Sequence, residues 1–133
     1  MKLRIRGNSV RVRLTKSEVD RLGTGERVEQ ATQFSKVASL KSSVESTPRV
    51  AAPLVEFAGS TLCVLLPTEL VRRWATSDQV TIDGKQDAGA GTLLQILVEK
   101  DFECIHSRAE GNNDAYPNPR ERQNLASHKS SGR

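Results

Sequence analysis

Two stretches of the chain, 52 residues apart, show the same order of hydrophobic and polar positions. In each stretch apolar residues first alternate with polar ones, as in short strands, and then recur at helical spacing. The stretches are "RGNSVRVRLTKSEVDRLGTGERV", residues 6–28, and "AGSTLCVLLPTELVRRWATSDQV", residues 58–80. Seven of the 24 residues from 7 to 30 are identical to the residue 52 places later. This self-similarity predicts a duplicated unit, and the alternative is two ββα units that share only their patterning.

Each copy predicts two strands around a tight turn, followed by a helix of about two turns. In the first copy the turn falls at Gly7-Asn8-Ser9, where Gly and Asn tolerate a positive φ. Thr15-Lys16-Ser17-Glu18 has the pattern of a helix capping box, and Gly23 indicates where the helix ends. In the second copy Pro67 stands at the helix start, and a wider apolar stripe follows at positions 70, 71 and 74.

The remaining segments predict further strands and a polar tail. Residues 27–34 and 36–43 are typical of a hairpin, residues 79–82 of a strand before a turn at Asp83-Gly84, and "TLLQILVEK", residues 92–100, of a strong strand. Residues 87–91 form a Gly-rich loop, and residues 46–53 connect the copies. We therefore expect a duplicated unit over residues 1–106, with copy one at 1–45 and copy two at 53–106. Residues 107–133, rich in Asn, Pro, Ser and charge, are expected to be a disordered tail.

The composition bounds the class of protein. With 133 residues, 36% of them hydrophobic and only five aromatic, the chain has one domain's worth of compact, aliphatic core. No apolar run approaches the ~20 residues that span a bilayer, and two cysteines do not indicate a disulfide framework. We expect a soluble, cytoplasmic protein that does not bind a membrane.

The charge is concentrated at the start of the chain. The net charge is +4, but residues 1–21 hold seven basic and two acidic residues, whereas residues 59–105 hold four basic and seven acidic ones. Alternation places the arginines of the two strands on one outward face, and Asn8 at its tip. Guanidinium groups bind phosphates in a bidentate manner, and a two-stranded ribbon fits a major groove. The predicted nucleic-acid-binding residues are Arg4, Arg6, Asn8, Arg11 and Arg13.

The second copy does not repeat this charge. Ala58, Cys63 and Leu65 stand at the positions of Arg6, Arg11 and Arg13. The strand "TLCVLLP" is therefore apolar on both faces, which is typical of a strand that is buried on both sides or docks a partner. The alternative for the arginine face itself is a solvated strand surface, or a contact with an acidic protein partner.

"RGNSVRVRLTKSEVDRLGTGERVE" resembles the swapped-hairpin module of AbrB- and MazE-type bacterial regulators. That module has a Gly-Asn-Ser turn, a strand, a short helix, and Gly-Asp/Glu-x-Val opening the next strand. "LCVLLPTELVRRWATSDQVTI" resembles it again, with the family's proline at Pro67. The resemblance implies a mostly β fold with two short helices, a compact cradle-loop-type barrel of the swapped-hairpin or double-psi form. It also implies DNA binding near the Gly-Asn-Ser turn, hence a DNA-binding regulator or antitoxin-like protein.

Three departures from the family pattern matter for function. The tryptophan usual before Gly-Asn-Ser is Arg6, and the first-copy proline is Thr15. A symmetric DNA reader also needs two basic faces for two half-sites, whereas this chain offers one.

The other candidate sites are weaker. The tail element "NNDAYPNP" is a candidate partner-binding motif through Tyr116, Pro117 and Pro119, which favours the alternative function, a protein-interaction adaptor that does not bind DNA. Cys104 and His106, even with Cys63 nearby, are one ligand short of a closed zinc site. No nucleophile–base spacing or phosphate loop is present in the sequence, so we expect no metal, no cofactor and no enzymatic activity.

Overall fold

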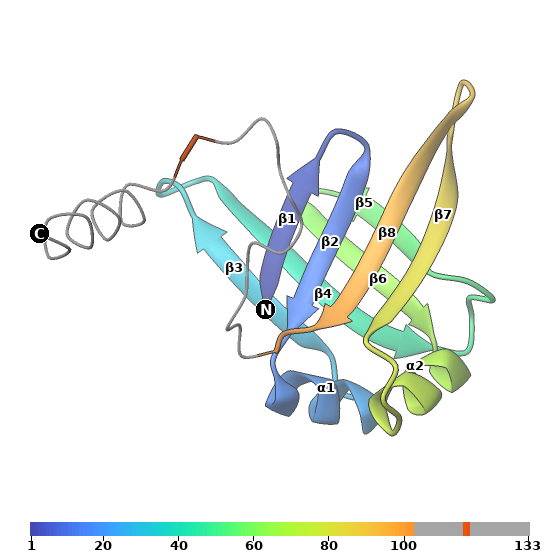
Figure 1. Ribbon diagram of the computed structural model, residues 1–133. Helices are drawn as coiled ribbons and strands as arrows, with labels where there is room; N and C mark the ends of the chain where they lie inside the picture. The colour runs from blue at the N-terminus through green and yellow to red at the C-terminus, as the bar shows by residue number, and fades with distance from the viewer. Residues whose placement is uncertain (103–115, 118–133) are drawn as a thin grey trace, which may run out of the picture. The chain divides into compact units, whose positions relative to one another are not determined.

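The computed structural model describes residues 1–102, 116 and 117. Residues 1–102 are mostly β with two short helices, as predicted (Figure 1). The elements are β1 (Lys2–Arg6), β2 (Ser9–Leu14), α1 (Lys16–Gly23), β3 (Val28–Gln33), β4 (Ser39–Thr47), β5 (Leu54–Ala58), β6 (Thr61–Pro67), α2 (Thr68–Ala75), β7 (Thr81–Gly89) and β8 (Thr92–Lys100).

The strands form two four-stranded sheets, and each sheet combines hairpins from both halves of the chain. The first sheet has the order β1-β2-β8-β7, and the second has the order β3-β4-β6-β5. Within each hairpin the strands are antiparallel, whereas the central pairs, β2 with β8 and β4 with β6, are parallel. Strand pairing leaves β1, β7, β3 and β5 as edges, so the described residues form two sheets and no closed barrel.

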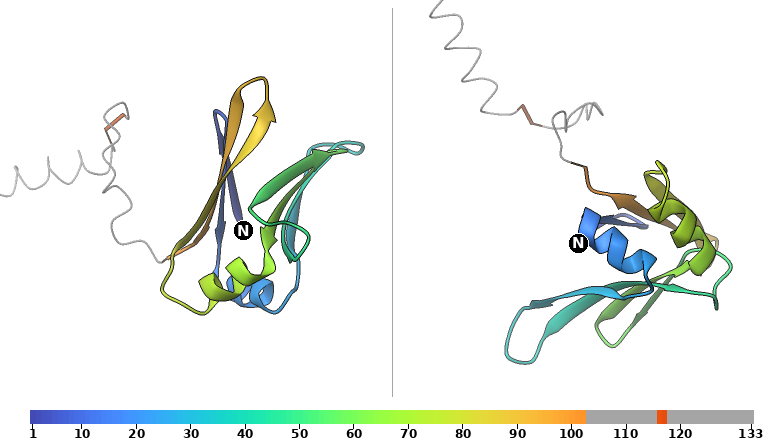
Figure 2. Two further views of the ribbon diagram at one scale, coloured as in Figure 1. Left: turned by 90° about the vertical axis from the view of Figure 1, so that its right-hand side faces the viewer. Right: turned by 90° about the horizontal axis from the view of Figure 1, so that it is seen from below.

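Equivalent elements of the two halves occur in the same order. The bounds of β5 and α2 are those of β1 and α1 shifted by 52 residues. The two helices lie side by side at one end of the sheets, and the sheets diverge from each other away from the helices (Figure 2). At the helix contact, a Cβ built on Gly23 would lie 3.3 Å from the Cβ of Ala75, the equivalent residue of α2.

The core lies between the inner faces of the sheets and above the helices. Alternate residues of the central strands point into it, because successive side chains of a strand face opposite sides. From the helices, Leu22 and Trp74 are fully buried. The Trp74 indole Nε1 donates to the Val80 carbonyl oxygen at 2.9 Å, and the Lys100 Nζ lies 5.7 Å from the ring centroid. Burial of the indole is therefore compatible with its polar N–H.

The capping box is present as predicted. The Glu18 amide donates to the Thr15 hydroxyl at 3.3 Å, and the Thr15 amide donates to the Glu18 carboxylate at 2.9 Å. Gly23, however, is the last residue of α1 and does not form its stop. Gly25 supplies the positive φ, +94°, after the helix, because a residue without Cβ enters the left-handed region most easily.

Three predicted boundaries are wrong in detail. Asp83-Gly84 is not a turn, since β7 runs from Thr81 to Gly89 and the chain reverses at residues 90–91. A Cβ on Gly84 would lie 3.0 Å from Pro53, so this glycine allows the connector to approach the strand. The predicted connector at 46–53 overlaps β4, which extends to Thr47. The first turn is Gly7-Asn8 alone, since Ser9 already belongs to β2.

Candidate nucleic-acid interface

The β1–β2 hairpin brings the four predicted arginines onto one outer face of the first sheet. In its antiparallel register Arg4 pairs with Arg11, and Lys2 pairs with Arg13. Val10 and Val12, the neighbours of Arg11, point to the core and are buried. Alternation therefore leaves the arginines on the surface side, together with Lys2, which the prediction missed. This group, Lys2, Arg4, Arg6, Arg11 and Arg13, is called the cationic face below.

Strand β8, from the other half of the chain, places a carboxylate beside the cationic face. The Glu99 Oε1 accepts from the Arg13 Nε at 2.8 Å and lies 3.6 Å from the Arg11 Nε. The Lys2 Nζ lies 3.2 Å from an Asp101 carboxylate oxygen. Three of the five cations therefore already have an acidic neighbour within the protein.

Arg4 and Arg6 differ from those three cations. Both side chains are exposed. Among residues 1–102, 116 and 117, no carboxylate lies within ion-pair distance of either guanidinium group. Both residues lie on β1, an edge strand. The uncompensated positive charge of the cationic face is therefore concentrated along the edge of the sheet.

Asn8 has a structural role at the tip of the hairpin. Its side-chain Nδ2 donates to the Leu93 carbonyl oxygen at 2.7 Å. Its main-chain carbonyl oxygen accepts from the Gln95 amide at 3.0 Å. These bonds attach the β1–β2 turn to β8. Gly7 adopts φ of +53° in this turn. The side-chain amide predicted to contact nucleic acid thus holds the ribbon in place.

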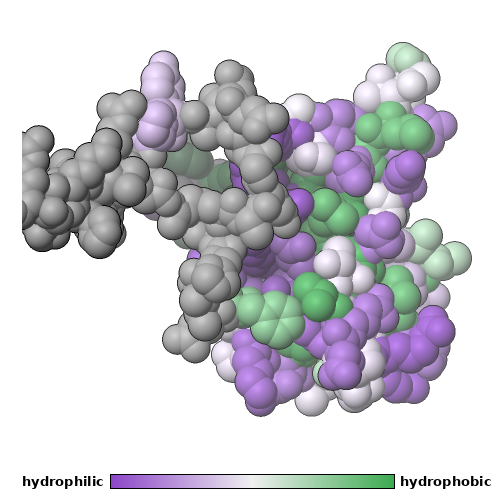
Figure 3. Space-filling view, in the orientation of Figure 1, coloured by the Kyte–Doolittle hydropathy of each residue, from purple (hydrophilic) through white to green (hydrophobic). Residues whose placement is uncertain are grey.

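The outer face of the first sheet is not uniformly polar. Its visible residues are mainly hydrophilic, with apolar residues among them (Figure 3). By the strand register Leu93 and Leu97 of β8 share the outer side with Arg11, and Leu93 is 58% exposed. A ligand of the cationic face would therefore meet charge on the β1–β2 side and partly apolar surface on the β8 side.

The equivalent face of the second sheet has a different chemistry. Cys63 and Leu65 occupy the places of Arg11 and Arg13, and Glu56 occupies that of Arg4. Leu65 is only 2% exposed although it lies on the side opposite the core residues Val64 and Leu66. At Leu65, therefore, the apolar strand is buried on both sides, which was the first of the two interpretations of "TLCVLLP"; the other was a strand that docks a partner.

The Cys63 thiol is partly buried and points to an acidic group. Its Sγ lies 3.8 Å from the Glu45 Oε1, and the other oxygen of that carboxylate, Oε2, lies 3.2 Å from the Arg27 Nη2. Burial, followed by the nearby Glu45 charge, raises the pKa of the Cys63 thiol above its ordinary value. A protonated thiol is a weak nucleophile, so this environment does not activate Cys63.

The other predicted sites lie largely outside the described residues. Tyr116 and Pro117 are exposed, the tyrosine to 97%. Pro119, Cys104 and His106 lie outside the described residues, as does the rest of the predicted tail at 107–133. Within the part of the chain that the structure describes, no helix is long and apolar enough to cross a membrane.

The described residues therefore define a small β protein with two sheets, each of which takes one hairpin from each half of the chain, and with a cationic edge at β1. The chain belongs to a family of unknown function, DUF7009, whose model matches residues 1–120. The search of curated proteins and the search of solved structures found no match.

Proposed function

We propose that the protein is a DNA-binding regulator or an antitoxin-like protein, and that it contacts the phosphate backbone with its cationic face. The observation that carries this proposal is the presence of two uncompensated guanidinium groups, Arg4 and Arg6, beside Arg11 and Arg13 on one hairpin. Guanidinium groups bind phosphate oxygens in a bidentate manner, and such contacts supply most of the sequence-independent affinity for DNA.

We also infer that the two sheets are a single-chain version of the cradle-loop arrangement. Each sheet takes one hairpin from each half, as expected if the halves exchanged hairpins within one chain. Because only one half carries the cationic face, the protein would present a single basic ribbon to DNA. A palindromic operator would then require two molecules, one for each half-site.

The test is the salt dependence of binding to a labelled mixed-sequence duplex, measured by fluorescence anisotropy. Each neutralised phosphate contributes about −0.9 to the slope of log K against log salt. Within the described residues Arg4 and Arg6 have no acidic partner, whereas Arg11 and Arg13 share Glu99 and Lys2 pairs with Asp101. We therefore expect a slope between about −1.8, for two neutralised phosphates, and about −4.5, for five. The double variant Arg4→Ala/Arg6→Ala should make the slope shallower by about 1.8.

Two further variants sharpen this experiment. Glu99→Gln removes the carboxylate next to Arg11 and Arg13, so it should increase the affinity and steepen the slope. Arg72→Ala/Arg73→Ala removes the same charge from the exposed side of α2 and is the matched control, which should change binding little. Absence of binding at ~50 mM salt, or an equal loss in both double variants, would refute the proposal.

A further inference from the structure

The edge strands β1 and β5, which are equivalent in the two halves of the fold, differ in how their outer main-chain groups are bonded. In the second half, the side chain of Gln86 on β7 caps β5. The Val55 amide donates to Gln86 Oε1 at 2.7 Å, and Gln86 Nε2 donates to the Val55 carbonyl oxygen at 3.0 Å. One side-chain amide thus replaces the main-chain partner that a neighbouring strand would provide. Such coverage protects an edge from pairing with another chain.

At the equivalent edge, β1, the described part of the chain provides no such cap. Leu3 stands at the position of Val55, 52 residues earlier. Within residues 1–102, the main chain of Leu3 and of Ile5 makes no hydrogen bond outside its pairing with β2. In an antiparallel pair, alternate residues direct their N–H and C=O groups away from the partner. The main-chain groups of Leu3, which correspond to the capped groups of Val55, and those of Ile5, which correspond to Phe57, therefore have no partner among residues 1–102.

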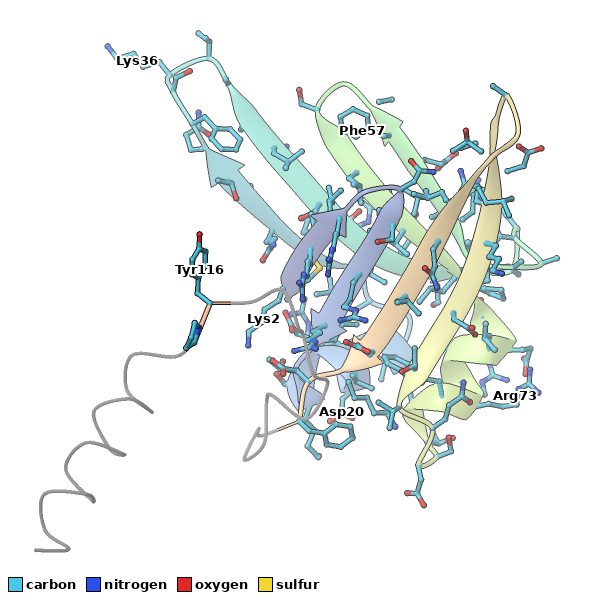
Figure 4. The ribbon with its side chains drawn as sticks, turned by 45° about the horizontal axis from the view of Figure 1, so that its top comes forward. Lys2, Asp20, Lys36, Phe57, Arg73 and Tyr116 are labelled. Atoms are coloured by element: carbon cyan, nitrogen blue, oxygen red, sulfur yellow. The ribbon has the colours of Figure 1, made fainter. Side chains whose placement is uncertain are left out.

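The side chains beside this free edge define what could bind it. The outer side carries Arg4 and Arg6, which lack ion-pair partners within the described residues. The inner side carries Ile5, which is 58% exposed. Its equivalent on the inner side of β5 is Phe57, which is also exposed. Phe57 lies at the end of the sheet that is far from Arg73 on α2 (Figure 4). An added strand would meet guanidinium groups on one face and an aliphatic surface on the other.

We propose that the free edge of β1 binds an extended segment of a partner protein in which acidic and apolar residues alternate. In such a segment the main chain pairs with Leu3 and Ile5, the carboxylates face Arg4 and Arg6, and the apolar side chains cover Ile5. This is strand addition, in which main-chain hydrogen bonds provide affinity and alternate side chains provide specificity. The proposal goes beyond DNA binding, because it uses the main chain and the inner face of β1.

A second copy of this chain is the less suitable occupant. Pairing β1 with β1 of another molecule would place arginines opposite arginines, and directly opposed like charges destabilise a sheet. The β5 segment, Leu54–Ala58, does alternate apolar residues with Glu56, but Gln86 occupies the edge N–H and C=O groups of Val55 at its centre. The opposed arginines and the cap on β5 therefore favour a different protein, rather than a second copy of this chain, as the occupant of the β1 edge.

The probe is a short labelled peptide of alternating valine and glutamate, compared with a peptide of the same composition whose glutamates form one block. We expect the alternating peptide to bind the full-length protein and to shift the amide NMR signals of residues 3–6. The block peptide, which cannot satisfy both faces at once, should bind at least ~tenfold more weakly, because one side of the added strand is then mismatched.

Variants of β1 separate strand addition from simple charge attraction. Ile5→Pro removes the edge N–H and should weaken peptide binding about tenfold or more. Phe57→Pro, at the equivalent place on the capped strand, is the matched control and should leave binding unchanged. Ile5→Thr keeps the preference for strand and removes the apolar contact, so it should weaken binding about threefold even if the proline variant is misfolded.

The outcomes also separate this proposal from DNA binding. Ile5→Pro and Ile5→Thr keep all four arginines, so we expect both variants to retain the DNA affinity of the unmodified protein. No peptide binding at about 1 mM, equal binding of both peptides, or peptide binding that Ile5→Thr does not change would overturn the proposal. Peptide binding with the expected pattern would support it whether or not the protein binds DNA.

Discussion

Glu18 shows how one side chain can connect several parts of a small fold. Its carboxylate accepts from the Thr15 amide at 2.9 Å, within the capping box, and from the Met1 amine at 2.8 Å. Partial burial on its own would raise the pKa of Glu18, but the hydrogen bonds from the amine and from Thr15 outweigh it, so the pKa lies below 4.5. The ionised form is therefore the one that the fold stabilises.

The lowered pKa of Glu18 predicts a loss of stability in acid. A carboxyl group whose pKa is lower in the folded state stabilises the fold above its unfolded pKa, near 4.5, and this contribution is lost as the pH falls through the folded pKa. Glu18→Gln should therefore reduce the free energy of unfolding by about 1 kcal/mol at pH 7. Urea denaturation across pH should show this difference shrinking below pH 4.5.

Asp20→Asn is the control for this prediction. Asp20 lies on the same helix and pairs with Lys16 at 3.7 Å, but both side chains are exposed. An exposed ion pair contributes little to stability, so this variant should behave almost as the unmodified protein does. A Glu18→Gln variant with the same stability as the unmodified protein at pH 7 would contradict the role given to Glu18.

At the scale of elements, local patterns predicted both helices and most strands, whereas long-range contacts decided the exceptions. The capping box and the apolar spacing of α1 are local, and they act in the same way in any fold. Gly84 is the counterexample. Asp-Gly is a strong turn signal, yet Pro53 lies so close that the glycine is needed within β7. No pattern near Gly84 contains that information, because Pro53 is 31 residues away in the chain.

Gly84→Val should therefore be unfavourable although valine is a good strand residue. A Cβ at this position would lie 3.0 Å from the Pro53 ring, so the connector or the strand must shift. We expect a loss of about 1–3 kcal/mol in the free energy of unfolding, as is typical of overpacking. Lys85→Val, at the neighbouring exposed position, is the matched control. A lower urea midpoint for Gly84→Val than for Lys85→Val would confirm the predicted loss of stability. Equal midpoints would show that the connector moves without cost.

At the scale of the whole molecule, the sequence predicted the arginines of the cationic face but not the Glu99 carboxylate beside them. The alternation of residues 2–14 places the arginines on one side of a hairpin, whatever the rest of the chain does. The position of Glu99 beside Arg13 depends on β8 pairing with β2 in parallel, across 86 residues of sequence. That pairing arises because one hairpin of each half joins the same sheet, and strand patterns alone do not determine which hairpins share a sheet.

Within the described residues few hydrogen bonds join the two sheets directly, and Gln86 makes two of them. It links β7 of the first sheet to the main chain of β5 in the second. Because the Val55 amide is partly buried, Gln86→Ala should leave it poorly satisfied and reduce the free energy of unfolding by about 1–2 kcal/mol. Removal of the cap should also expose β5 as a second free edge and promote association at high protein concentration.

Urea denaturation, hydrogen exchange of the Val55 amide and light scattering would test the role of Gln86 together. Gln95→Ala, on the exposed outer side of β8, removes the same side chain without touching a sheet edge and should change none of the three. We expect faster exchange of the Val55 amide in Gln86→Ala even if the loss of stability is small, because local opening requires only the loss of the cap. Unchanged exchange at Val55 would mean that the two sheets are held together by the core and the helices alone.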